Sequence, residues 1–120
     1  MTTIPEALDA LLDAARTVAG VNVYQGDGTG TLRTPAVVVS LPVVRWERYC
    51  PDPTSGRFTV TIAVGMNEYA MGRLLELLPL VHAAVEDTGA TVNEATPVPF
   101  NSPIASSGLV GYQLDTEFPL

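Results

Sequence analysis

The chain has 120 residues, the length of one domain, and we expect residues 1–120 to form a single unit around a hydrophobic core. Hydrophobic residues make up 47% and charged residues 16%, which excludes a mostly disordered chain. Thirteen acids against six arginines and no lysine give a charge of −7, which disfavours nucleic-acid binding. We expect neither a membrane span, because no apolar run is long enough, nor a secretory leader.

A helix is expected from Ile4 to Val18. Thr3 and Glu6 have the T-x-x-E spacing of a capping box, in which the two residues satisfy backbone amides at a helix start. Gly20 is expected to end the helix. Apolar residues recur at helical spacing and predict one buried face: Ile4, Leu8, Leu11, Leu12 and Ala15.

The next segments favour strands. Val21–Tyr24 is followed by a glycine-rich loop (residues 25–34), and then by a valine-rich strand, residues 36–41, which we expect to be buried on both faces. Pro42 interrupts that strand. Residues 43–49 remain extended, a CPDPTSG turn follows at residues 50–56, and residues 57–64 alternate apolar and polar. The last two extended runs predict a long antiparallel hairpin.

A second amphipathic helix is expected after an Asn67 N-cap, ending near Asp87, with a kink or a restart at Pro79. Residues 90–98 and 109–118 then read as strands, the latter half-buried. The expected order is one helix, three strands, one helix and two strands. We therefore predict an α+β fold: a single mixed, mainly antiparallel sheet of about five strands with two helices packed on it.

No residue pattern predicts catalysis. The GDGTG run at residues 26–30 lacks the lysine and the following helix of a phosphate loop. His82 is the only histidine and Cys50 the only cysteine, so neither a transition-metal site nor a nucleophilic pair is expected. We expect no enzyme activity, no catalytic residue, no metal and no cofactor.

The hairpin carries the residue types that dominate protein interfaces. Three of the six arginines and the only tryptophan lie in or beside it. Trp46 either covers one face of the sheet or contacts a partner. Under the second interpretation the arginines pair with acids of another subunit, and unlike surfaces of identical chains meet head to tail. The candidate interface residues are Arg45, Trp46, Arg48, Tyr49 and Arg57.

The sequence of elements also resembles a known family. A short helix (IPEALDALLDAA), V-x-V-Y, a glycine-rich loop, PAVVVSL, a hairpin, LLELLPLVHAAV and a final GYQLDTEF follow one another in an acidic chain. This order, over nearly the full chain, resembles the tail terminator proteins of long-tailed bacteriophages, particularly those that infect actinobacteria. The resemblance implies a mixed sheet flanked by helices and a structural, non-enzymatic role.

The resemblance implies a location in the virion neck, after assembly in the host cytoplasm, and specific partners. Six copies would form a ring on the last ring of major tail tube protein, end tube growth and receive the head–tail connector, while genomic DNA passes through without specific binding. Asp27 and Asp52, on loops, are candidates for the lumen or for partner contacts. Two alternatives stay open: another neck component, such as a stopper, connector or tail-completion protein, and a small cytosolic ligand-binding domain.

Overall fold

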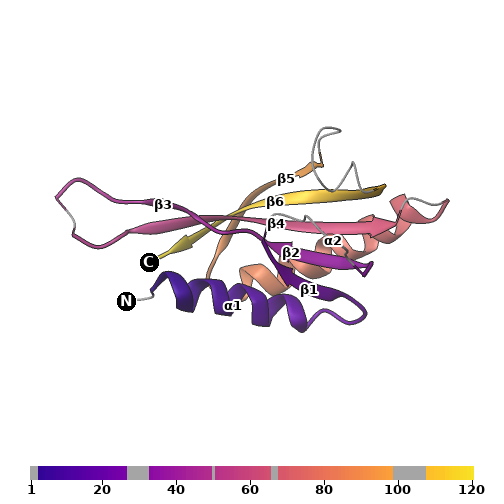
Figure 1. The fold of residues 1–120 in the computed structure, drawn as a ribbon, viewed down its shortest axis with the longest axis horizontal. Coiled ribbons are helices and arrows are strands. Elements are labelled where there is room, and N and C mark those ends of the chain that lie inside the picture. Colours follow the sequence, from indigo (N-terminus) through magenta and orange to yellow (C-terminus); the bar gives the residue numbers. More distant parts are fainter. Residues whose placement is uncertain (1–2, 27–32, 50, 66–67, 99–107) are drawn as a thin grey trace.

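The structure is a computed structural model that describes residues 3–26, 33–49, 51–65, 68–98 and 108–120. It has the predicted α+β fold, with two helices on one mixed, mainly antiparallel sheet (Figure 1). The sheet has six strands rather than about five. In chain order the elements are α1 (Ile4–Arg16), β1 (Asn22–Gln25), β2 (Ala36–Val39), β3 (Val43–Arg45), β4 (Ser55–Gly65), α2 (Ala70–Glu86), β5 (Thr91–Pro97) and β6 (Leu109–Pro119).

The strands lie in the order β1-β2-β4-β6-β5, and β3 pairs with the first part of β4. Only β1 and β2 run parallel; the other pairs are antiparallel. The ladder between β4 and β6 is the longest and joins residues 55–65 to residues 109–119. This long central pair sets the length of the molecule, which measures 51 × 28 × 22 Å along its principal axes.

The extra strand arises because the first arm of the hairpin is broken. Val39 faces Val60, but Val43 faces Arg57, so three residues on one arm, 40–42, lie opposite two on β4. Such a bulge accommodates Pro42, which has no amide for the ladder. Ser40 closes the gap: its amide donates to the Thr59 carbonyl at 3.0 Å and its hydroxyl accepts from the Thr59 amide at 2.8 Å.

Helix α1 begins with the Thr3 half of the predicted capping box; the Glu6 carboxylate accepts from the Thr3 hydroxyl and not from the Thr3 amide. The Thr3 hydroxyl accepts a hydrogen bond from the Glu6 amide at 3.3 Å and lies 3.0 Å from the Glu6 carboxylate. The helix ends at Arg16, two residues before the expected end. Four of its residues are buried against the sheet and α2: Ala7, Leu11, Leu12 and Ala15.

Helix α2 runs without interruption from Ala70 to Glu86, so the expected restart at Pro79 does not occur. Pro79 lies on the exposed side, where water can satisfy the Leu75 carbonyl that the missing amide leaves without a helical partner. The N-cap residue is Tyr69 instead of the expected Asn67, which lies outside the described residues.

The core lies between the helices and one face of the sheet. Alternate residues of β4 contribute Phe58, Val60 and Ile62, all fully buried, as the alternation predicts. Strand β2 is buried at all four positions, as its unbroken run of apolar residues predicts. On the other face, exposed polar side chains lie on β5 and the nearby parts of β4 and β6: Arg57, Glu94 and Glu117. The helices thus cover one side, and on the other side the part of the face near β5 and the hairpin end remain exposed, whereas Val38, Thr61 and Ala63 are buried there.

Candidate interaction surface

The loop of the hairpin projects beyond the sheet. Strand β3 ends at Arg45, four residues before the end that the sequence predicts. The Arg45 carbonyl accepts hydrogen bonds from the amide and the hydroxyl of Thr54, at 2.9 and 3.2 Å. Residues 46–49 and 51–53 therefore belong to the loop, and they lie at one end of the long axis (Figure 1). The sequence predicted an extended strand for Trp46, Arg48 and Tyr49, and this prediction is wrong, because all three residues lie in the loop.

The aromatic side chains of this loop are exposed. Trp46 is 55% exposed and Tyr49 is 89% exposed, so Trp46 does not cover a face of the sheet. The Arg48 guanidinium lies 5.1 Å from the centre of the Tyr49 ring, a cation–π distance. Tyr49 has a φ of +69°, a left-handed conformation that is uncommon for tyrosine. The loop thus presents a tryptophan, a tyrosine and an arginine to solvent, and these residue types are enriched at binding hot spots.

The hairpin arginines divide into two kinds. Arg57 donates two hydrogen bonds to the Asp115 carboxylate, at 2.7 and 2.5 Å, so its charge is engaged within the chain. Arg45 and Arg48 form no ion pair with any described residue. The expected pairing of Arg57 with acids of another subunit would have to replace the Asp115 contact, whereas Arg45 and Arg48 can meet partner carboxylates directly.

The Arg57–Asp115 pair predicts a pH dependence of stability. The hydrogen bonds and charge of Arg57 hold the pKa of Asp115 below its ordinary value, and Asp115 raises that of Arg57. The pKa of an aspartate in the unfolded chain is about 3.9. Because the pKa of Asp115 is lower than this in the folded chain, its ionised form stabilises the fold fully at pH values above the unfolded pKa. This contribution is lost as the pH falls through the lowered pKa of the folded chain. Asp115→Asn should therefore reduce the free energy of unfolding near pH 7 but much less below about pH 4.

The loss should be small, because both partners are partly exposed. Urea unfolding at several pH values measures it. Asp13→Asn is the control, because it removes an exposed ion pair between neighbouring turns of α1. A deficit in the Asp115→Asn protein that persists unchanged at pH 3 would contradict the assigned linkage.

Of the two loop acids named as candidates for the lumen or for partner contacts, the structure describes one. Asp52 is exposed in the hairpin loop and forms no ion pair with a described residue. Asp27 lies outside the described residues. Their expected place in a lumen or at a partner contact stays a prediction.

A second exposed apolar surface lies on α2, and the sequence interpretation did not identify it. The large hydrophobic side chains that are exposed in the described parts of the chain fall into two segments only. One is the hairpin with the break that precedes it, and it contains Leu41, Val43, Trp46 and Tyr49. The other is α2 with its N-cap residue, and it contains Tyr69, Met71, Leu75 and Leu80. A signal was present, because leucines occur on more sides of this helix than one buried stripe requires.

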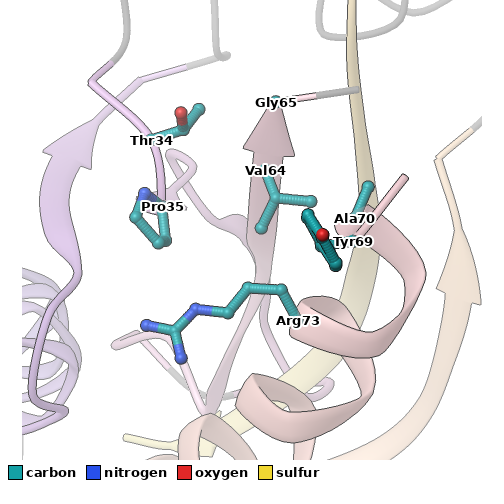
Figure 2. A pocket seen from close by; sticks show the side chains of 7 residues that line it. All are labelled: Thr34, Pro35, Val64, Gly65, Tyr69, Ala70 and Arg73. Carbon is teal, nitrogen blue, oxygen red and sulfur yellow. The ribbon is translucent and has the colours of Figure 1, made fainter. Parts of the chain in front are cut away.

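A shallow pocket of about 290 Å³ lies at the opposite end of the sheet from the hairpin. Figure 2 shows its lining: Thr34, Pro35, Val64, Gly65, Tyr69, Ala70 and Arg73. Arg73 is the one charged residue among the described residues that line it, and its guanidinium also approaches the Glu76 carboxylate at 3.5 Å. The described lining residues include no carboxylate, histidine or cysteine, and their hydroxyl groups are those of Thr34 and Tyr69.

No grouping of three or more histidine, cysteine or acidic side chains that could hold a metal occurs among the described residues. Within the same residues, no helix has the length and hydropathy to span a membrane. The most distinctive surfaces are therefore the hairpin loop and the exposed side of α2. No protein-family model matches the sequence, and no curated protein is significantly similar to it.

Proposed function

We propose that this protein is a tail terminator of a long-tailed bacteriophage: a structural protein whose copies form a ring that caps the tail tube. The observation that carries the proposal is the projecting hairpin loop, with Trp46 and Tyr49 exposed and Arg45 and Arg48 without an ion-pair partner among the described residues. Exposed aromatic and arginine side chains on a projecting loop favour a protein contact over a role in the core.

The placement of the exposed surfaces favours a ring. The hairpin loop lies at one end of the molecule, and α2 extends toward the other (Figure 1). When two unlike surfaces of identical chains meet, the contact is heterologous, and it closes into a ring if the rotation between neighbours is suitable. The resemblance described above specifies six copies for that ring.

The net negative charge of the chain supports the passage of DNA through the proposed ring. Six copies at −7 each carry a formal charge of −42. A channel lined with part of this charge repels the phosphate backbone, so that DNA slides through without being held. The mixed sheet with two helices is also the architecture that the resemblance implies.

The partner distinguishes a terminator from the other neck proteins. Labelled protein should bind the ends of purified tail tubes from a phage of the same group and stop the addition of tube subunits, as counted by electron microscopy. Isolated head portals from that phage serve as the parallel target. Binding to portals without binding to tube ends would replace the terminator with a stopper or connector, and binding to neither would contradict a role in the neck.

A further inference from the structure

Strand β5 is the last strand of the sheet, so one of its sides pairs with β6 and the other faces away from the sheet. Unpaired amides and carbonyls along such an edge are a template on which a second chain can add a strand. We propose that a bulge, Pro97 and the Glu86 side chain together close this edge, so that copies of the chain cannot associate by extending one another's sheets. The inference is independent of the proposed function, because it concerns neither a tail tube nor a connector.

The register identifies the residues of β5 whose backbone groups face outward. The Val98 amide donates to the Gly111 carbonyl at 2.9 Å, so Val98 faces β6. In an antiparallel pair, residues that exchange hydrogen bonds alternate with residues that do not. Counting back from Val98, the backbone groups of Pro97 and Ala95 therefore face outward. Beyond the bulge, Val92 is the next outward-facing residue, because its amide bonds to a group on α2 and not on β6.

Two of these three outward positions offer no free amide. Pro97 has no N–H group. The Val92 amide donates to the Glu86 carboxylate at 3.0 Å, and the same carboxylate oxygen lies 3.4 Å from Nε2 of His82. Of the three, only Ala95 has an amide without a partner among the described residues. An added strand needs bonding groups at every second residue of the edge, and here it finds a single amide.

The bulge also breaks the period of the edge. The register shifts between Val92 and Glu94, so the outward-facing residues Val92 and Ala95 are three positions apart instead of two. A bulge bends its strand and increases the local twist. A regular strand from another chain therefore cannot follow β5 along its length.

The edge borders exposed apolar surface, which is why its protection has a consequence. An open groove of about 460 Å³ lies between α2 and β5, and Leu75, Leu78 and Val92 are among the residues that line it. Leu75 is 53% exposed. A strand added to β5 would bury part of this surface, and the burial would favour the addition. Because ordering the backbone of that strand is costly, the edge amides decide the outcome.

Amide hydrogen exchange tests the Glu86 contact within one strand. Val92 and Ala95 both face outward, and we expect the protection factor of the Val92 amide to exceed that of Ala95 by about tenfold or more. Glu86→Ala should lower the protection of Val92 to that of Ala95. Glu86→Gln should preserve it, because glutamine keeps an acceptor oxygen. Equal protection of the two amides in the wild-type protein would overturn the role of Glu86.

Opening the edge tests its consequence. The double variant Glu86→Ala, Pro97→Val frees one outward amide and adds another, and it should form strand-paired aggregates that bind thioflavin T roughly tenfold faster than wild type. The control is Glu76→Ala, Thr96→Val, which removes a carboxylate from the same helix and adds a valine to the same strand. Glu76 contacts Arg73, and the Thr96 amide faces β6, so the control leaves the outward amides unchanged.

Both double variants are compared where far-UV circular dichroism shows that they are folded. If the opened variant associates no faster than the control, the edge is not what prevents association, and the proposal is wrong. A control that associates as fast as the opened variant has the same meaning. If the opened variant does not fold, Pro97→Val alone takes its place, because it adds one outward amide and keeps the Glu86 contact. Ring formation through the hairpin can succeed or fail without changing any of these results.

Discussion

Replacing Trp46 by alanine together with Arg48 by glutamate is expected to abolish assembly of the protein while leaving its fold intact. Both side chains lie in the exposed hairpin loop, and Trp46 is more than half exposed, so their replacement removes no core contact. Loss of a tryptophan hot spot costs about 2 kcal/mol or more, roughly 30-fold in Kd for each interface. Light scattering should find monomers with the far-UV circular dichroism of wild type.

The control for this double variant is Arg33→Glu. It changes the net charge by the same two units, and Arg33 is exposed outside the hairpin. If both proteins fail to assemble, general repulsion between more acidic subunits explains the result. If the double variant forms rings like wild type, the hairpin is not part of the interface, and if it unfolds, Trp46 belongs to the core.

Gly111→Ala is expected to destabilise the protein strongly, because among the described glycines Gly111 has the closest backbone neighbour to an added Cβ. Gly111 is the third residue of β6 and faces Ala63 across the longest ladder of the sheet. A Cβ at this position would overlap the backbone carbonyl oxygen of Ile62 and press on a methyl of Val98. Because a backbone atom of the central strand cannot move aside cheaply, we expect a loss of about 3 kcal/mol.

Gly72→Ala is the matched control. Gly72 is exposed on α2, and a Cβ there meets nothing within 4 Å. Alanine is favoured over glycine inside a helix by about 0.5 to 1 kcal/mol, so this substitution should stabilise the protein. Urea unfolding of both variants gives the two changes in free energy. Equal stability of Gly111→Ala and wild type would show that β6 does not approach β4 as described.

Much of the fold could be predicted because its determinants are local. The Thr3–Glu6 spacing predicts the start of α1, and the alternation from Phe58 onward predicts which side of β4 is buried. The end of β3 could not be predicted in the same way. Residues 46–49 look extended, but β6 ends opposite Ser55, so no neighbouring strand continues the sheet beyond that point.

The surface properties depend on distant contacts and were less predictable. The pairing of Arg57 with Asp115 joins residues 58 positions apart, and no sequence spacing indicates it. It depends on the register that sets β4 beside β6. The exposure of Leu75 likewise depends on α2 covering the sheet without covering β5 completely. Sequence patterns indicated that the hairpin carries interface residues, but not which of its arginines remain without an internal partner.

The central claim is that this chain assembles by itself into a closed ring, and its mass in solution tests that claim most directly. Size-exclusion chromatography with light scattering over a concentration series, with negative-stain images of the peak, gives both the mass and the shape. We predict a species of six chains, about 76 kDa for a 12.7 kDa chain, that appears as annuli. A monomer at every concentration, with no annuli even in the presence of tail tubes, would contradict it.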